Sequence, residues 1–384
     1  MNILWDTRSV SSHMGGIGRA SVGWLRGVLR NKPTHWNIRV IATSMCPQEL
    51  FFSLVPELPE RDCVFVDAGM IDPIFEQVQL PSIIKNLRTD VYLNTCFTIP
   101  AIKTCKIQLS CVHDLVFLEH PEWVDSKLRR FLELGTDLAM KEADLVLTVS
   151  NYSKAKMVEI AQSRSWKKTD RIRVVFPGLD DSCFSADSHR FKRSDSLEMK
   201  DKCKQSLLYI GSIERKKGIL QLLDGYKIVR ERVDDAPLLI IAGGKGGQDF
   251  DLNHEITLRG LNDWIQYEGV VSDQRKYELI ARAVIFIFPS LYEGFGIPPL
   301  EAMALGTPVI ASDATALPEV LDSSAKFVPA GDSSALGHAI IQLMTSPSER
   351  EKLGQSGRIW AQAFTIEKTA MPLIEAIRDL EKQQ

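Results

Sequence analysis

Short runs of aliphatic and β-branched residues alternate along the chain with longer segments of helical periodicity. In the first half, the runs expected to form strands are NILWD, IRVIAT, CVFVDA, DVYLNT, KIQLSCVHD and DLVLTVS. Most of them are apolar on both faces, which is typical of parallel strands covered by helices. Between them, apolar residues recur every three or four positions, from Ile17 to Val28 and from Leu128 to Leu138. This alternation predicts a doubly wound α/β domain.

A second series of the same kind begins at LLYIGSI and continues with PLLIIAGG, IQYEGV, AVIFIFPS, TPVIAS and AKFVPAG. The segment between the two series is polar, serine-rich and charged, as is typical of an interdomain connection. We therefore predict an α/β fold with two tandem Rossmann-like domains that face each other across a cleft. The predicted parts are domains over residues 1–180 and 206–364, a linker over residues 181–205, and a C-terminal amphipathic helix over residues 365–384 that packs back on the first domain.

Composition narrows the class of protein. The 384 residues, of which 45% are hydrophobic and 25% charged, suit a soluble globular protein of two domains. A net charge of −3 gives no general affinity for nucleic acid. No apolar stretch reaches the roughly 18 residues of a membrane span, and the start, MNILWDTRSV, lacks the apolar region of a signal peptide. We expect a cytoplasmic protein whose seven cysteines are reduced, because none of them forms a CxxC pair.

The segment YEGFGIPPLEAMALG places two carboxylates around a turn rich in glycine and proline. Open parallel sheets bind ligands beyond the carboxyl ends of their strands, so this strand-to-helix loop is expected on the ligand side. Gly294 and Gly296 let the backbone approach a ligand, and the amides before the helix can bind an anion. Glu293 on the loop and Glu301, expected in the first helical turn, can accept hydrogen bonds from hydroxyl groups. A site that binds phosphate through backbone amides and hydroxyl groups through carboxylates is suited to a nucleotide-sugar. Taken alone, Glu301 could simply be a favourable residue at a helix start.

Two segments of the first half carry candidate chemistry at strand ends. The loop SSHMGGIGRAS opens a helix, and its Gly15 and Gly16 leave the backbone free to approach phosphates while Arg19 adds a positive charge. It is no dinucleotide fingerprint, because Ser21 takes the place of the third glycine. CVHDLVF places His113 at the end of another strand. A structural turn and a core histidine are the plainer alternatives for these two segments.

A basic run and a glycine pair mark two further loops in the second half. In YIGSIERKKGILQ, Arg215, Lys216 and Lys217 would repel the dipole of the following helix unless an anion neutralises them, and a solvated turn is the alternative. In LLIIAGGKGGQ, Gly243 ends a strand, and no P-loop can be drawn through the segment. The DFD triplet at residues 249–251 looks like a metal-binding motif, but no third ligand is evident, and we expect a surface loop.

These motifs, in this order, resemble the family 4 retaining glycosyltransferases of the GT-B architecture, and the resemblance covers nearly the whole chain. The family signature E-x7-E stands here as EGFGIPPLE. The resemblance implies that His113, Lys217 and Glu293 are catalytic. It implies donor contacts from Gly15, Gly16, Arg19, Ser212, Arg215, Lys217, Gly243, Val271, Glu293, Gly294, Phe295, Gly296, Ile297 and Glu301. Many members carry an arginine where this chain has Ser212, so Arg215 or Lys216 would supply that charge.

The implied reaction is the transfer of a hexose, with retention of configuration, from a UDP- or GDP-sugar such as UDP-glucose or GDP-mannose. The acceptor would be a hydroxyl of a glycan or a lipid-linked molecule in surface polysaccharide biosynthesis. Neither a metal nor pyridoxal phosphate is expected as a cofactor, and nucleic acid is not expected as a partner. The alternatives are an epimerase or a phosphorylase-like enzyme on the same scaffold, and a nucleotide-sugar-binding subunit without activity.

The segment 151–174 is rich in lysine and arginine and contains Trp166. It is either a solvated helix of mixed charge or a peripheral contact with anionic lipid at the inner face of the membrane, beside a lipid-linked acceptor.

Overall fold

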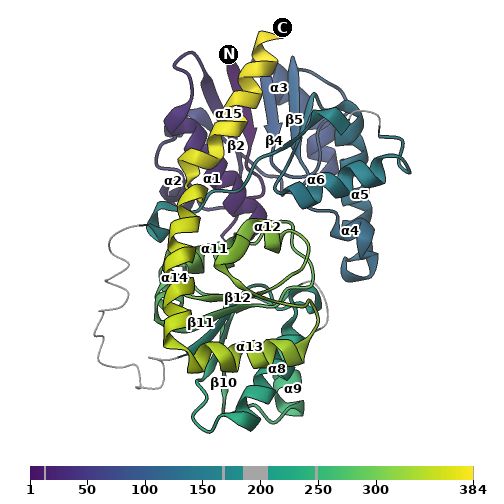
Figure 1. Cartoon of the computed structure of the whole chain (residues 1–384). Coiled ribbons are helices and arrows are strands. Elements are labelled where there is room, and N and C mark those ends of the chain that lie inside the picture. Colours follow the sequence, from purple (N-terminus) through teal and green to yellow (C-terminus); the bar gives the residue numbers. More distant parts are fainter. Residues whose placement is uncertain (13, 167–168, 185–205, 247–249, 384) are drawn as a thin grey trace. The chain divides into compact units, whose positions relative to one another are not determined.

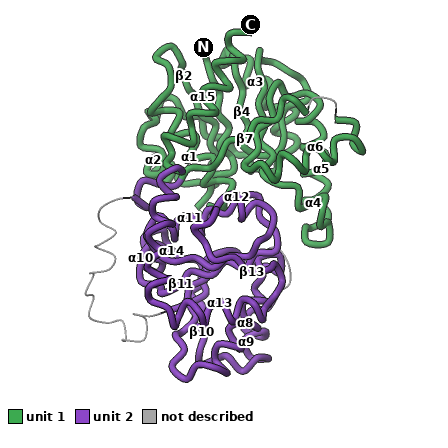
Figure 2. Tube along the Cα trace, viewed as in Figure 1, with its two compact units in different colours: residues 1–178, 364–384 green, residues 179–363 purple. Residues whose placement is uncertain are grey.

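The structure is a computed structural model that describes residues 1–12, 14–166, 169–184, 206–246 and 250–383. The chain forms two compact α/β units, the first made of residues 1–178 and 364–384 and the second of residues 179–363 (Figure 1; Figure 2). Most of the predicted linker lies outside the described residues, and its described part carries the 3-10 turn η5 (Asp181–Cys183).

The first unit is built on a parallel sheet of seven strands. These are β1 (Asn2–Asp6), β2 (Asn37–Thr43), β3 (Cys63–Val66), β4 (Val91–Asn94), β5 (Ile107–Cys111), β6 (Leu145–Thr148) and β7 (Ile172–Val174). They lie in the order β3-β2-β1-β4-β5-β6-β7, so the strand order reverses between β1 and β4. Ligands of open α/β sheets bind at such a point, beyond the carboxyl ends of the strands. Strand β7 was not predicted, because three residues are too few to show a periodicity.

The helices of the first unit include the C-terminal helix of the chain. They are α1 (Gly16–Asn31), α2 (Gln48–Leu54), α3 (Leu80–Asn86), α4 (Val116–Glu119), α5 (Ser126–Glu142), α6 (Asn151–Ala161) and α15 (Ile366–Lys382). Helix α15 packs against α1 (Figure 1). A Cβ atom at Gly27 would lie 2.2 Å from the carbonyl oxygen of Ile366, so only glycine lets the two helices approach this closely.

The second unit repeats the pattern with six parallel strands. These are β8 (Ser206–Ile210), β9 (Leu239–Ala242), β10 (Ile265–Gly269), β11 (Ala283–Phe288), β12 (Val309–Ser312) and β13 (Lys326–Val328). Their order is β10-β9-β8-β11-β12-β13, and it reverses between β8 and β11. The helices are α8 (Ile219–Arg232), α9 (Leu252–Leu258), α10 (Asp273–Arg282), α11 (Ile297–Ala304), α12 (Leu317–Leu321), α13 (Ser333–Thr345) and α14 (Pro347–Ala361).

The strands near the middle of both sheets are buried on both faces, as the apolar runs predict. Every residue of β4, β5 and β6 is buried in the first unit, and every residue of β8, β9 and β12 in the second. Helices cover both faces of such sheets, which is why these strands do not alternate apolar with polar residues. The cysteines among the described residues are all free thiols, and Cys203 lies outside them.

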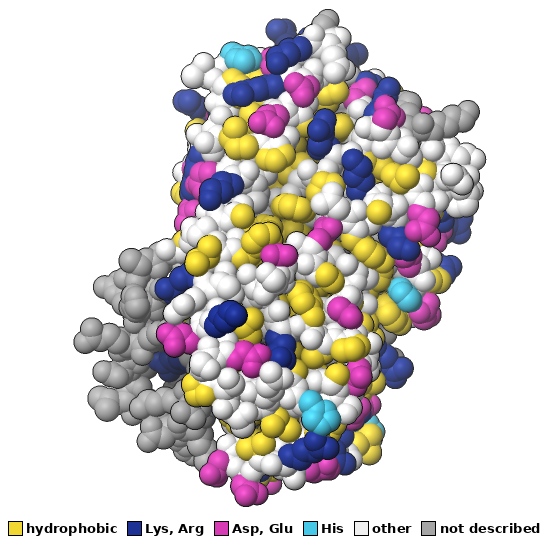
Figure 3. Space-filling view, in the orientation of Figure 1, with side chains coloured by type: hydrophobic (Ala, Val, Ile, Leu, Met, Phe, Trp, Pro, Cys, Tyr) yellow, Lys and Arg dark blue, Asp and Glu magenta, His cyan; other side chains and the backbone are white. Residues whose placement is uncertain are grey.

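Acidic and basic side chains are interspersed among hydrophobic ones on the face shown in Figure 3. This mixture agrees with the small net charge of the chain. Within the described residues, no helix combines the length and the apolar character needed to cross a membrane.

Candidate active site

Two loops of the second unit meet beyond the carboxyl ends of β8 and β11, the neighbouring strands at which the strand order reverses. Lys217 Nζ, from the loop after β8, donates to Glu293 Oε1, from the loop after β11, at 2.8 Å. The main chains are joined as well, because the N–H of Leu291 donates to the carbonyl oxygen of Lys216 at 2.8 Å. The fold thus brings a predicted cation and a predicted carboxylate together at the point where the sheet is expected to bind its ligand.

The basic run precedes helix α8, as the sequence predicts, and forms a 3-10 turn, η7 (Arg215–Lys217). Gly218 follows with a φ of 70°, and a Cβ atom there would lie 1.9 Å from the carbonyl oxygen of Pro289. Only glycine therefore allows the turn to end against the neighbouring loop. The side chain of Arg215 is exposed, whereas Lys216 Nζ lies 3.3 Å from Glu214 Oε2.

Glu214 carries a negative charge into this basic turn. Burial alone would raise the pKa of Glu214, but Lys216, the Ser212 hydroxyl and Lys217 together hold it below its ordinary value. The carboxylate is therefore ionised at neutral pH, and it offsets part of the positive charge of the turn.

The EGFG turn leads directly into α11, with Gly296 as the residue before the helix at a φ of 111°. Pro298 and Pro299 take the second and third helical positions and lack an N–H group. Among the first three helical residues, Ile297 is therefore the only one that can donate to an anion. The side chains of Phe295 and Ile297 are buried, so these two residues would reach a ligand only through their backbone amides.

Glu301 was predicted in the first turn of its helix but lies in the second turn of α11, because the helix already begins at Ile297, before the two prolines. Its Oε1 accepts from Lys276 Nζ at 2.5 Å, and both side chains are buried. A direct ion pair, and not the helix dipole, therefore stabilises this carboxylate. Lys276 was not predicted from the sequence. The periodicity of α10 could have indicated it. Lys276 lies three positions before Leu279 and four before Ile280, so it falls on the apolar side of the helix, where a lysine needs a buried partner.

The ends of β8, β9 and β10 present mainly backbone at the same edge of the sheet. Gly243 has a φ of 144°, and a Cβ atom there would lie 1.8 Å from the carbonyl oxygen of Gly211. The hydroxyl of Tyr267 donates to the carbonyl oxygen of Gly243 at 2.9 Å. Ser212, after β8, and Val271, after β10, are half-buried. These contacts place the predicted residues of three loops along one edge.

In the first unit, the glycine-rich loop precedes α1 beyond the carboxyl end of β1. Gly15 and Gly16 are exposed, and no described atom lies within 4 Å of a Cβ atom built at either position. The backbone of the loop is therefore open to a ligand. Arg19 lies in the first turn of α1 and is half-buried.

His113 follows β5 and is buried. Its Nε2 lies 2.6 Å from the carbonyl oxygen of Thr95, and its ring stacks on Trp24 of α1 with centroids 6.1 Å apart. Burial lowers the pKa of His113 below its ordinary value, so the ring is neutral at neutral pH. Since a carbonyl can only accept, Nε2 carries the proton and Nδ1 is the acceptor of the ring. The neighbouring Asp114 accepts a hydrogen bond from the N–H of Val116, the first residue of α4, at 3.1 Å.

Polar side chains that the sequence analysis did not single out hold these loops in place. The Thr95 hydroxyl lies 2.9 Å from Ser21 Oγ and 3.2 Å from the carbonyl oxygen of Asp6. It thereby links helix α1 and the ends of β1 and β4 at the reversal point of the first sheet.

A buried charged cluster lies where the chain leaves β1. Arg8 Nη2 lies 2.9 Å from Asp6 Oδ2 and 3.4 Å from Glu76 Oε2. The hydroxyl of Tyr92 donates to Asp6, and that of Thr98 donates to Glu76 at 2.6 Å. Two carboxylates share one guanidinium, and burial raises the pKa of Glu76 to about 6 despite these partners. The cluster fixes the main chain just before the glycine-rich loop.

Two further segments singled out in the sequence are the DFD triplet and the basic segment 151–174. Asp249 of the DFD triplet lies outside the described residues, and Asp251 caps α9 by accepting from the N–H groups of Asn253 and His254. Among the described residues, no group of three or more His, Cys, Asp or Glu side chains could hold a metal ion. In the basic segment, Trp166 is buried and its Nε1 donates to Asp137 at 2.8 Å, so this tryptophan cannot contact lipid.

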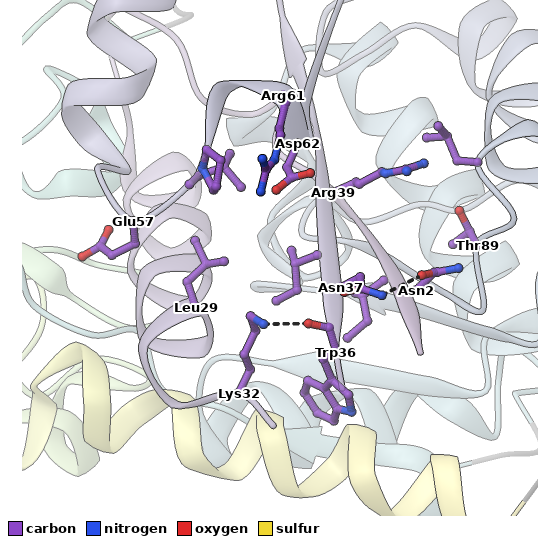
Figure 4. A pocket seen from close by; sticks show the side chains of 15 residues that line it. Asn2, Leu29, Lys32, Trp36, Asn37, Arg39, Glu57, Arg61, Asp62 and Thr89 are labelled. Carbon is purple, nitrogen blue, oxygen red and sulfur yellow. Dashed lines mark hydrogen bonds between the residues drawn. The ribbon is translucent and has the colours of Figure 1, made fainter. Parts of the chain in front are cut away.

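A separate hollow of about 460 Å³ lies at the amino ends of β1 and β2 in the first unit (Figure 4). Arg39 and Arg61 line it, and Asn37 Nδ2 donates to Asn2 Oδ1 at 3.3 Å. None of the described residues that line this hollow is a site residue predicted from the sequence. It opens at the edge of the sheet opposite to the carboxyl ends of the strands, so it is not the predicted site.

Two parallel sheets, of seven and six strands and each with a reversal of strand order, define an α/β protein of the GT-B class. Comparisons with known proteins agree. Residues 191–360 match the family described as "Glycosyl transferases group 1". The chain is 31% identical to O-antigen chain mannosyltransferase B of Escherichia coli over 271 residues, which are 69% of this chain and 68% of that protein. It is 28% identical to O-antigen chain mannosyltransferase RfbU of Salmonella typhimurium over 253 residues, 66% of this chain and 65% of that protein.

A solved structure shows the same fold. The structure of Anabaena HepE in complex with UDP and glucose superposes with a TM-score of 0.77 at 17% identity, and the match covers 99% of this chain and 100% of that one. The chain belongs to the group 1 glycosyltransferases.

Proposed function

We propose that this glycosyltransferase moves a hexose, with mannose as the first candidate, from a nucleoside diphosphate sugar to a hydroxyl of a glycan or lipid-linked acceptor. The ion pair between Lys217 and Glu293 carries the proposal, because it joins a cation for the diphosphate to a carboxylate for sugar hydroxyls at a ligand-binding edge. The names of the O-antigen chain mannosyltransferases favour mannose and a role in surface polysaccharide assembly. GDP-mannose is therefore the first donor to test, and UDP-glucose the second.

The second unit is proposed to hold the donor. Lys217, the exposed Arg215 and the amides from Gly294 to Ile297 would bind the diphosphate. Glu293 would accept hydrogen bonds from the sugar, and Glu301, oriented by its lysine partner, from the ribose. The backbone at Gly243 and Val271, with Ser212, would lie along the nucleotide.

The first unit is proposed to hold the acceptor and to contact the transferred sugar. The backbone at Gly15 and Gly16 is open enough to approach phosphate or sugar, and Arg19 would add charge. His113 would contact a hydroxyl of the sugar through Nδ1, because its Nε2–H is engaged by Thr95. A neutral, buried ring is suited to positioning a hydroxyl and not to donating a proton.

In the proposed mechanism, the bond between the anomeric carbon and the diphosphate oxygen breaks through an oxocarbenium-like state. Negative charge accumulates on the departing diphosphate, so a fixed cation and backbone amides aimed at it lower the barrier most. The acceptor oxygen attacks from the face that the diphosphate leaves, and a phosphate oxygen takes the acceptor proton. Configuration is then retained, and no protein side chain has to act as the base.

Release of nucleoside diphosphate tests the proposal. The protein is incubated with GDP-mannose, UDP-glucose or an ADP-sugar, with water or a glycan acceptor, and free GDP, UDP or ADP is measured. Release from one donor, with the product in the retained anomeric form by NMR, is the expected result. Epimerisation of the donor, or nucleotide binding without any release, would instead identify an epimerase or an inactive binding subunit. A pyridoxal phosphate absorption band in the purified protein would identify a phosphorylase-like enzyme.

A further inference from the structure

The loop that carries Glu293 is braced along its length by residues 312–317, which comprise the last residue of β12, the following loop and the first residue of α12. Ser312 Oγ donates to the carbonyl oxygen of Ser290. Thr315 Oγ1 donates to the carbonyl oxygen of Glu293 at 2.8 Å and accepts from the N–H of the same residue at 2.9 Å. Each of these contacts joins residues 22 positions apart, so the two loops run side by side in constant register.

The backbone of Thr315 is strained, with a φ of 49°. A β-branched residue in this left-handed region is a genuine outlier, and such residues persist only where the surroundings hold them. Glycine or asparagine would fit the conformation without strain, but neither has a hydroxyl group that donates and accepts at one atom. The strained residue is therefore the one whose side chain can satisfy both backbone groups of Glu293.

The brace extends to the end of the turn. A Cβ atom at Gly296 would lie 2.7 Å from Leu317 Cδ2, so the bracing loop also contacts the residue that precedes α11. Glu293 is thus held by Thr315 at its main chain and by Lys217 at its carboxylate. The direction of the carboxylate, and that of the amides after it, depends on a peptide that Thr315 fixes.

We propose that Thr315 is a positioning residue for the transfer reaction. It acts through Glu293, whose backbone it clamps, and it sets where the carboxylate and the turn amides meet the donor. This inference rests on the proposed role of Glu293 in binding the sugar. A small displacement of a group that positions substrate lowers the rate steeply, and about 1 Å can reduce it roughly 100-fold.

The test measures release of GDP from GDP-mannose, or of UDP from UDP-glucose if only that donor reacts. Thr315→Val keeps the shape and removes the hydroxyl, while Thr315→Ser keeps the hydroxyl and removes the methyl group. We expect kcat of Thr315→Val to fall by about 10- to 100-fold, and that of Thr315→Ser to stay within about threefold of the wild type. In a Glu293→Gln background, Thr315→Val should cause a clearly smaller further loss than in the wild type, since the carboxylate through which both changes act is already gone and only the turn amides can still shift.

Three results would contradict the positioning role of Thr315. Wild-type turnover of Thr315→Val, an equal loss in Thr315→Ser, or a full additional loss in the Glu293→Gln background would overturn the inference. If Glu293→Gln alone turns over normally, the proposed role of Glu293 fails instead, and the two failures are distinguishable. Thermal unfolding controls for folding, and Thr315→Gly provides a second variant without the hydroxyl and without the strain. It should fold as stably as the wild type and still turn over slowly.

Discussion

If Lys217 binds the donor diphosphate as proposed, Glu293 and the diphosphate share one cation, and this gives a prediction of unusual sign. Lys217 Nζ lies 2.8 Å from Glu293 Oε1, and the two side chains are only 18% and 10% exposed. Glu293→Gln keeps the size of the side chain and removes its charge. The variant should bind free nucleoside diphosphate more tightly than the wild type, although it should turn over more slowly.

The magnitude follows from the geometry. At 2.8 Å and an effective dielectric constant of about 20, Coulomb's law gives the pair a gross attraction of about 6 kcal/mol, most of which desolvation offsets. Two anions that share one ammonium nitrogen lie about 4 to 5 Å apart, which corresponds to a repulsion of about 4 kcal/mol. Rotation of the side chain and solvent screening leave roughly a third of this value. We therefore expect binding to be stronger by about 1.4 kcal/mol, or roughly tenfold.

Isothermal titration calorimetry of GDP and UDP with the wild type and Glu293→Gln measures this difference. Glu214→Gln is the matched control, because it removes the same charge from a carboxylate that pairs with Lys216 in the same turn. An equal gain in both variants would mean a general electrostatic effect. Unchanged or weaker binding by Glu293→Gln alone would refute the competition for Lys217.

Four further predictions test separate parts of the argument. Lys217→Ala should reduce turnover roughly 100-fold or more, as loss of one charge-stabilising donor does, and near-normal release of nucleotide would exclude its proposed role. Glu301→Gln should raise the KM for the donor more than it lowers kcat, and an unaltered donor affinity would count against ribose binding. Gly218→Ala should lower the melting temperature more than Gly260→Ala, because both glycines have a φ near 70° but only the first would place a Cβ against a neighbouring carbonyl oxygen, at 1.9 Å; equal shifts would contradict the clash. The raised pKa of Glu76, about 6, means that the native state holds this proton more tightly than the unfolded chain does. Its contribution, about 2 kcal/mol, is therefore present below about pH 4.5 and is lost as the pH rises through about 6. Denaturation at about pH 5 and about pH 7.5 should accordingly show the wild type losing stability relative to Glu76→Gln, and a difference that does not change with pH would disprove it.

Much of the local structure could be predicted from the sequence. All twelve runs predicted as strands are strands, and the apolar periodicity of Ile17 to Val28 lies within α1. Ser150 caps α6 by accepting from the N–H of Ser153, as expected of a serine before a helix. These features depend on residues a few positions apart, so propensity, periodicity and turn chemistry are sufficient to find them.

Local sequence patterns predicted the exact start of a helix and the position of strained residues less well. Glu301 was expected in the first helical turn but lies in the second, because α11 already begins at Ile297, before the two prolines that mark a helix start in the sequence. Nothing in the sequence marked Thr315, since a left-handed conformation is expected of glycine or asparagine and not of threonine. Its conformation is imposed by the hydrogen bonds to Glu293.

The sequence by itself determined the elements, the alternation that makes parallel sheets, and the loops that follow the strands. Only the tertiary structure decided which loops meet. Lys217 and Glu293 are 76 positions apart, and Lys276 and Glu301 are 25 positions apart. These pairs form because the strand order reverses between β8 and β11, and because α10 and α11 bury opposite charges against each other. Strand order and the pairing of buried charges are properties of the whole fold, to which no short stretch of residues gives access.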